Sequence, residues 1–167
     1  MSHSTETEKI RGIVALLRIT LGVILLATWW DNLGKGLYSG EGLVDFFSWL
    51  FDAESGNGSQ LHVYKQLLDG TILRLPSLFA GFQLMAELMI GLLLLLGLFT
   101  PIAGAAAAFF FANLFLAYLG GHEWIWTYVL LTITALVVAL ARSGRTRLGM
   151  DRVILARKGE PPYPYLW

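Results

Sequence analysis

Two charged residues lie inside long apolar stretches of the sequence, and they are the first candidates for chemistry. Arg18 falls in the first such stretch and Glu87 in the second. A charge in the interior of a bilayer costs roughly 3 kcal/mol or more unless it is paired or hydrated, and it usually marks a functional site. Gln83 lies one helical turn from Glu87 on the same face, and Asn113 adds a polar group in a third stretch. Together these four residues predict a polar centre inside an apolar bundle.

Three interpretations of Arg18 and Glu87 remain open. Counted from the ends of their stretches that lie nearest the basic tails, the two differ in depth by about 9 Å at the helical rise, which an arginine side chain can largely span. In the first interpretation the two residues are functional: they form a buried pair, or Glu87 accepts a proton beside a quinone or ligand pocket. In the second, they form an ion pair that only fixes the helix register. In the third interpretation, Arg18 extends to the lipid headgroups.

Other groups with chemical potential are sparse. Cys is absent, which excludes disulfides, thiolate nucleophiles and Cys-ligated clusters. None of the three histidines lies in the middle of an apolar stretch, where axial ligands of a b-type haem would be expected. His62 and His122, with Glu123, lack the spacing of a metal site. We therefore predict no metal and no covalently bound cofactor, and leave a quinone as the candidate ligand.

The composition places these residues in a membrane protein. Of the 167 residues, 56% are hydrophobic and only 14% are charged, and the mean hydropathy is +0.61. These values are far from those of a soluble domain of this length. Twelve basic residues balance twelve acidic ones, so there is no overall field to attract nucleic acid, and we expect no nucleic-acid partner.

Four apolar stretches have the length of a membrane-spanning helix, because 18 to 22 residues cover a hydrocarbon core of about 30 Å. Backbone polar groups in lipid must be paired within the chain, which favours uninterrupted helices. The predicted fold is an all-α integral membrane protein, a four-helix transmembrane bundle in one domain over residues 1–167. A cleavable signal peptide is the alternative for the first stretch, but a small-residue cleavage site is missing. The predicted spans are 12–30, 78–99, 102–119 and 124–141.

Basic residues outside these stretches predict the orientation. The N-terminal arm and the tail 142–167 hold eight Lys and Arg, whereas the segment 31–77 holds three. Cytoplasmic segments are enriched in such residues, so both termini are predicted to be cytoplasmic. The expected location is a prokaryotic inner or plasma membrane. Four tryptophans would then mark the outer interface, namely Trp29, Trp30, Trp124 and Trp126.

The outer segment 31–77 predicts an interfacial helical layer. Residues 43–51 are dense in aromatics, with Asp45, Ser48 and Asp52 on one helical face. A second amphipathic stretch runs from about residue 60 to 75 and is stopped by Pro76. The segment holds six carboxylates against three cations, so it would repel an anionic substrate.

Two further patterns concern packing. Gly104, Ala108 and Ala112 recur at four-residue spacing and predict a face that packs closely against a neighbouring helix. The Pro-rich end of the tail, 161–165, cannot be helical and is expected to lie along a partner or the headgroups.

Three short motifs, taken in order, resemble DoxX-like membrane proteins. The first is Leu-Arg-Ile-Thr-Leu-Gly at 17–22, followed by Lys35. The second is Ala-Glu-Leu-Met-Ile-Gly at 86–91, continuing through Gly-Leu-Phe-Thr-Pro at 97–101. The third, at 144–152, is similar to the Gly-Arg-x-x-Leu-x-x-Asp ending of that family. The resemblance covers roughly residues 12–154.

The resemblance implies a four-span protein. Some members are the integral subunit of a thiosulfate:quinone oxidoreductase, and the long outer segment is closer to this DoxD-like type. Arg18, Glu87, Arg145 and Asp151 are the positions that the resemblance singles out, without an agreed catalytic role.

We therefore expect a membrane subunit of a quinone-linked oxidoreductase or respiratory-type complex. Its expected partners are the lipid membrane and either other subunits or further copies of the chain. The alternative is a non-catalytic accessory or scaffold subunit, and whether the chain is itself an enzyme stays open. A transporter fits less well, because the stretches show no polar pore-lining pattern.

Overall fold

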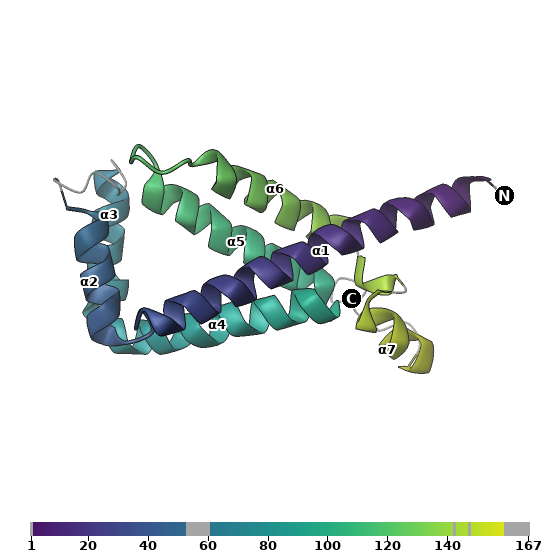
Figure 1. The fold of residues 1–167 in the computed structure, drawn as a ribbon, viewed down its shortest axis with the longest axis horizontal. Coiled ribbons are helices and arrows are strands. Elements are labelled where there is room, and N and C mark those ends of the chain that lie inside the picture. Colours follow the sequence, from purple (N-terminus) through teal and green to yellow (C-terminus); the bar gives the residue numbers. More distant parts are fainter. Residues whose placement is uncertain (1, 53–60, 142, 147, 159–167) are drawn as a thin grey trace.

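The computed structural model describes residues 2–52, 61–141, 143–146 and 148–158. All regular secondary structure in these ranges is helical (Figure 1). In chain order the elements are α1 (Ser2–Gly34), α2 (Gly40–Leu50), α3 (His62–Gly70), η1 (Ile72–Arg74), α4 (Pro76–Leu96), α5 (Thr100–Tyr118), α6 (Trp126–Ala141), η2 (Ser143–Arg145) and α7 (Met150–Lys158).

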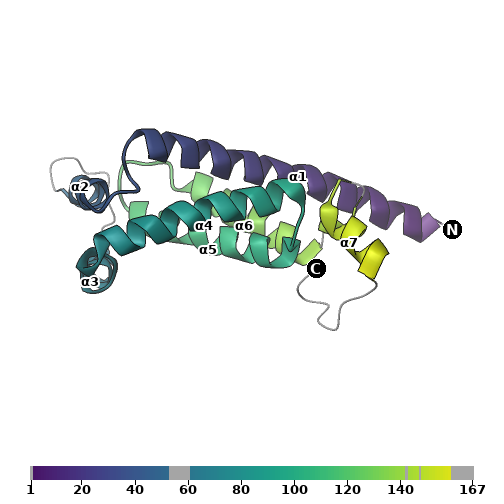
Figure 2. The same ribbon diagram turned by 90° about the horizontal axis from the view of Figure 1, so that it is seen from below.

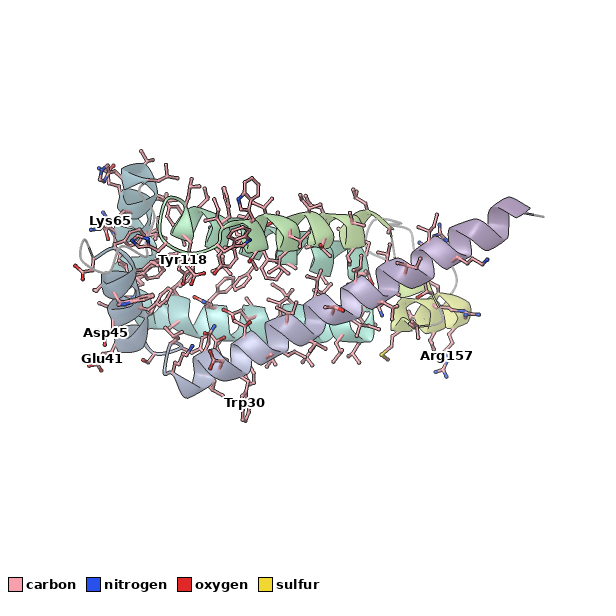
Figure 3. All side chains as sticks on the ribbon, turned by 45° about the horizontal axis from the view of Figure 1, so that its top comes forward. Trp30, Glu41, Asp45, Lys65, Tyr118 and Arg157 are labelled. Atoms are coloured by element: carbon pink, nitrogen blue, oxygen red, sulfur yellow. The ribbon has the colours of Figure 1, made fainter. Side chains whose placement is uncertain are left out.

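Four long helices form an elongated bundle of two pairs. α1 packs along α4, α5 packs along α6, and α1 also crosses α6 (Figures 1 and 2). α2 and α3 lie across one end of the bundle, and α7 lies at the other end beside the N-terminal part of α1. For brevity, these are called the α2/α3 end and the α7 end. Trp30, predicted at the outer interface, lies toward the α2/α3 end and is exposed (Figure 3).

Within the described ranges, three helices are long and apolar enough to cross a membrane: Lys9–Gly34 of α1, α4 and α5. The prediction of an all-helical membrane protein is therefore confirmed. α6 has 16 residues, which corresponds to about 24 Å at the helical rise and is shorter than a core of about 30 Å. The prediction of four full-length spans is thus met for three helices. α1 also extends well beyond the predicted stretch 12–30 at its N-terminal end.

Small residues bring the paired helices into close contact. A Cβ atom added to Gly22 of α1 would lie 2.7 Å from the backbone nitrogen of Leu95 in α4. A Cβ atom on Gly104 of α5 would lie 2.7 Å from the backbone nitrogen of Ala139 in α6. Ala108, one turn further along α5, is buried. The predicted packing face at Gly104 and Ala108 is confirmed, because only small residues allow the backbones to approach this closely.

The predicted outer layer consists of α2 and α3 with the short η1. The Ser39 hydroxyl caps α2 by accepting a hydrogen bond from the Gly42 amide at 3.0 Å. Leu50, at the end of α2, is fully buried against Ala117 and Tyr118 of α5. The stretch 60–75, expected to be continuous, is divided between α3 and η1, and Pro76 begins α4 instead of only ending the preceding segment.

Gly104→Ala tests the contact between α5 and α6. The added methyl group must displace backbone atoms, so we expect a loss of about 1–3 kcal/mol in the free energy of unfolding. Gly81→Ala in α4 is the matched control, because a Cβ atom there meets nothing within 4 Å. Thermal unfolding in detergent should show a lower midpoint for Gly104→Ala only. Equal midpoints for the two variants would contradict the packing described here.

Candidate functional site

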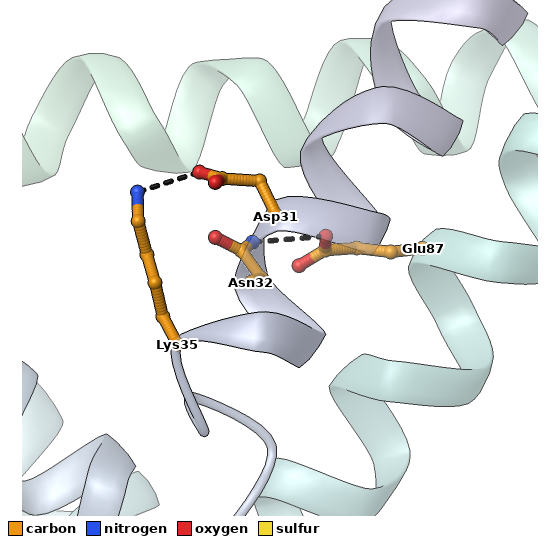
Figure 4. Close-up of polar contacts among 4 residues, drawn as sticks. All are labelled: Asp31, Asn32, Lys35 and Glu87. Atoms are coloured by element: carbon orange, nitrogen blue, oxygen red, sulfur yellow. Dashed lines mark hydrogen bonds and ion pairs between the residues drawn. The ribbon is translucent and has the colours of Figure 1, made fainter.

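A buried carboxylate with three hydrogen-bond donors lies between α1 and α4. Glu87 has no exposed surface. Its Oε1 atom accepts a hydrogen bond from the Gln83 amide at 2.8 Å. Its Oε2 atom accepts one from the Tyr38 hydroxyl at 2.7 Å and one from the Asn32 amide at 3.4 Å (Figure 4). This set of four residues is called the Glu87 cluster below.

Three elements supply the donors. Gln83 precedes Glu87 by one turn of α4, and Asn32 lies in the last turn of α1. Tyr38 follows a tight turn between α1 and α2, in which Gly36 has a φ of 73° and the Leu37 amide bonds to the Asn32 carbonyl at 3.1 Å. The left-handed conformation at Gly36 lets the chain reverse, and Tyr38 returns to α4.

The donors of the Glu87 cluster are all neutral. Within the described part of the chain, no Lys or Arg forms an ion pair with Glu87. Lys35, the nearest cation in sequence to this turn, pairs with Asp31 on the exposed side of α1 (Figure 4). Hydrogen bonds to a carboxylate stabilise its charged form, whereas burial favours the protonated form. Because these partners are neutral, protonation of Glu87 would break no ion pair, which suits a proton-exchanging group.

Tyr38 connects Glu87 to the α2/α3 end. Its ring is half-buried, whereas Glu87 is fully buried. Burial and the hydrogen bond to Glu87 raise the pKa of Tyr38 above its usual value. The phenol consequently stays protonated at neutral pH and remains a donor to the carboxylate.

An apolar groove lies along η1 and the first turns of α4. It has a volume of about 540 Å³. Phe79 lines the groove and lies four residues before Gln83, which itself lies four residues before Glu87. The three side chains therefore lie on one face of α4. The groove thus comes within about one turn of the Glu87 cluster. Its lining residues are Thr71, Ile72, Leu75, Leu78, Phe79 and Phe82.

Arg18 belongs to a different site. It is fully buried, its Nη2 atom donates to the Leu148 carbonyl at 2.7 Å, and its guanidinium packs against Gly97. Gly97, the C-cap residue of α4, follows Glu87 by ten residues, a separation of about 15 Å along the helix axis. The structure therefore contradicts a direct pair between Arg18 and Glu87. It also contradicts extension of Arg18 to the headgroups, because protein atoms cover the side chain.

Asp151 caps the start of α5 from the C-terminal tail. Its carboxylate accepts hydrogen bonds from the Phe99 amide at 2.9 Å, the Thr100 amide at 3.2 Å and the Thr100 hydroxyl at 2.9 Å. Its own amide donates to the Gly97 carbonyl at 3.0 Å. Phe99, the N-cap residue of α5, provides no side-chain cap of its own. A negative group at a helix N-terminus is favourable, and here it comes from a residue far along the chain.

Three glycines make room for this arrangement. Gly97 has a φ of 68° and contacts Arg18, so a side chain there would be both strained and obstructed. Gly144 packs against Asp151, and Gly149 packs against the backbone of Gly144. The tail motif, with Arg145 half-buried in η2, therefore forms a clasp with Arg18 and the turn between α4 and α5. These contacts are structural, and they account for Arg18 and Asp151 without catalysis.

The remaining candidates lie apart from Glu87. The Asn113 side chain donates to the Phe109 carbonyl of its own helix at 2.9 Å. His62 and His122 are exposed, and among the residues with described positions no three metal-binding side chains come together. Of the four residues predicted to share a polar centre, the structure brings together only Gln83 and Glu87. Asn32 and Tyr38 were not anticipated, because Asn32 reaches Glu87 through the packing of α1 on α4 and Tyr38 reaches it through the turn at Gly36.

The family comparison agrees with this architecture. A family model described as DoxX matches residues 13–122, more than half of the chain. The matched range contains the whole Glu87 cluster and Arg18, and it ends before the tail that carries Asp151. No curated protein and no solved structure matches the chain.

Asp151→Ala tests the clasp. The substitution leaves the part-buried Phe99 amide and the buried Thr100 amide and hydroxyl without their acceptor, so we expect a loss of about 2 kcal/mol in the free energy of unfolding. The tail should also become more sensitive to protease. Asp69→Ala, at an exposed position of α3, is the control and should unfold at the same temperature as the unsubstituted protein. An unchanged unfolding midpoint in Asp151→Ala would show that the clasp does not stabilise the bundle.

Proposed function

The chain belongs to the DoxX family, and we propose that it is the membrane subunit of a quinone-linked oxidoreductase in which Glu87 exchanges a proton with the quinone. The observation that carries this proposal is the burial of Glu87 among three neutral donors. An ion pair that fixed the helix register would place a cation against Glu87. Glu87 instead has neutral partners, so no ion pair is broken when its charge changes.

The surroundings of Glu87 suit a quinone. Reduction of a quinone to a quinol takes two electrons and two protons, and the molecule combines an apolar ring and tail with two carbonyl oxygens. The groove on α4 offers an apolar surface, and the Gln83 amide and the Glu87 carboxyl lie one and two helical turns beyond its lining residue Phe79. In this scheme the partner subunit supplies the two electrons, and Glu87 supplies the two protons one after the other, regaining a proton through Tyr38 from the α2/α3 end after each transfer.

We assign the electron supply to a partner subunit, since the sequence has no Cys and no mid-span His to hold a redox centre. The type of donor is constrained by charge. The segment 31–77 carries six carboxylates and three cations, which disfavours direct binding of thiosulfate at this end. A thiosulfate:quinone subtype would therefore need the partner to bind the anion.

The proposal includes a topology. We assign α6 as a fourth span, because the sequence is apolar from residue 124 to 141 and α6 runs beside α5 (Figure 1). The α7 end, which carries both basic tails, would face the cytoplasm of a prokaryotic inner membrane. The Glu87 cluster then lies in the outer half of the bilayer.

A non-catalytic accessory subunit is the second candidate, and the outer layer favours it. α3 leaves Val63 and Leu67 exposed, at 79% and 58%. Exposed apolar side chains on a short helix next to a membrane suit either the bilayer interface or another protein. In this role the chain would hold a complex together, and the Glu87 cluster would only fix α1 against α4.

Glu87→Gln distinguishes the two candidates. The amide keeps the size of the side chain but cannot release a proton, so we expect quinone reduction by the complex with its native partner to fall at least about tenfold, a typical contribution of general acid catalysis. The unfolding temperature should stay close to that of the unsubstituted protein. Asn113→Leu is the control, because Asn113 lies in a neighbouring helix away from Glu87. Unchanged turnover in Glu87→Gln would favour the accessory role.

A further inference from the structure

The surface at the α7 end is suited to one class of ligand by its position relative to the membrane, its exposed apolar side chains and its charge. We propose that α7 and the first turns of α1 form a binding surface for anionic phospholipid headgroups. The surface consists of the exposed residues Lys9, Arg11, Met150, Arg152, Val153 and Arg157. It is called the basic apron below, and it is independent of the function proposed for Glu87.

The clasp fixes the depth of α7. Asp151 is bonded to Gly97, Phe99 and Thr100, which form the turn between α4 and α5. Both helices have the length and hydropathy of a membrane span, so their connecting turn lies where the hydrocarbon core ends. The first residues of α7 are therefore held at the level of the lipid headgroups.

The outward face of α7 has the composition of an interfacial helix. Asp151 points inward and is fully buried, whereas Met150 and Val153 are 44% and 50% exposed. Arg152 and Arg157 are exposed beside them, and Figure 3 shows Arg157 at the far end of the molecule from Asp45 and Lys65. At headgroup depth the apolar side chains can enter the acyl boundary while the guanidinium groups reach phosphates.

The N-terminal part of α1 repeats this combination. Lys9 and Arg11 are exposed, and they alternate with Ile10 and Ile13, which are 56% and 62% exposed. This part of α1 runs past the ends of α4 and α5 and lies at the same end as α7 (Figures 1 and 2). Two separate segments thus contribute basic and apolar groups to one end of the bundle.

The charge distribution selects anionic lipids. Although the net charge of the chain is zero, the two ends of the protein carry net charges of opposite sign. Residues 1–11 and 142–167 contain eight Lys and Arg against four carboxylates, and one of these carboxylates, Asp151, is occupied by capping. Residues 31–77 together with Glu123 contain three cations against seven carboxylates. Each Lys or Arg near an anionic surface contributes roughly 1 kcal/mol, so the apron attracts anionic headgroups and the α2/α3 end repels them.

Native mass spectrometry of the purified chain in uncharged detergent tests the proposal. After addition of equal amounts of phosphatidylglycerol and phosphatidylcholine, we expect adducts mainly with phosphatidylglycerol. Arg152→Gln with Arg157→Gln should weaken this preference by about fivefold per residue. Lys65→Gln with Arg74→Gln, the same change in charge at the α2/α3 end, should leave it unaltered. Equal binding of the two lipids, or an equal loss in the control, would overturn the proposal.

Two further measurements distinguish a lipid from a free phosphate and from a surface that only touches water. An excess of inorganic phosphate, compared with chloride at the same ionic strength, should leave the adducts in place, whereas their specific displacement would indicate a phosphate site.

Because the chain has no Cys, Val153→Cys can carry a single fluorophore. In vesicles, brominated acyl chains should quench it. A label quenched only by aqueous iodide would place α7 in water and overturn the proposal.

Discussion

The structure depends on burying two opposite charges in a bundle that lipid surrounds, without letting them neutralise each other. A charged group removed from water needs hydrogen bonds or an opposite charge in its place. Arg18 has the Leu148 carbonyl and the attraction of Asp151. Glu87 has the neutral donors Gln83, Asn32 and Tyr38. The difference between these two solutions separates a group that holds the fold from one that we propose changes its protonation.

The sequence was a good guide to features with a local cause. Long apolar runs indicate helices in lipid wherever they occur, so the positions of α4 and α5 agree with the predicted spans to within about three residues. The bond between Gln83 and Glu87 follows from their four-residue spacing on one helix. The close approach at Gly104 follows equally from small residues at regular spacing.

The parts that could not be predicted depend on contacts between distant segments. Tyr38 reaches Glu87 only because the chain reverses at Gly36, and no periodicity in the sequence encodes that reversal. Asp151 caps α5 from about fifty residues away, in place of the local side-chain cap that Phe99 cannot provide. The expectation that Arg18 could reach Glu87 came from comparing the depths of the two residues in their own helices. That comparison did not include the C-terminal tail. The tail supplied a nearer partner for Arg18, so of the interpretations left open by the sequence, those in which Arg18 pairs with Glu87 do not hold.

The two ends of the bundle are joined in different ways, and this bears on where chemistry can occur. At the α7 end, Asp151 ties the turn between α4 and α5 to the tail with buried hydrogen bonds, and the glycines beside it leave no free space. At the α2/α3 end, α2 packs on α4 and its Leu50 is buried against α5, so apolar contacts connect the two helix pairs. Apolar contacts are less directional than hydrogen bonds, and they tolerate small displacements more readily. The turn that carries Tyr38 leads directly into α2, so the group that bonds to Glu87 is connected to the end of the bundle where apolar packing of α2 joins the two helix pairs.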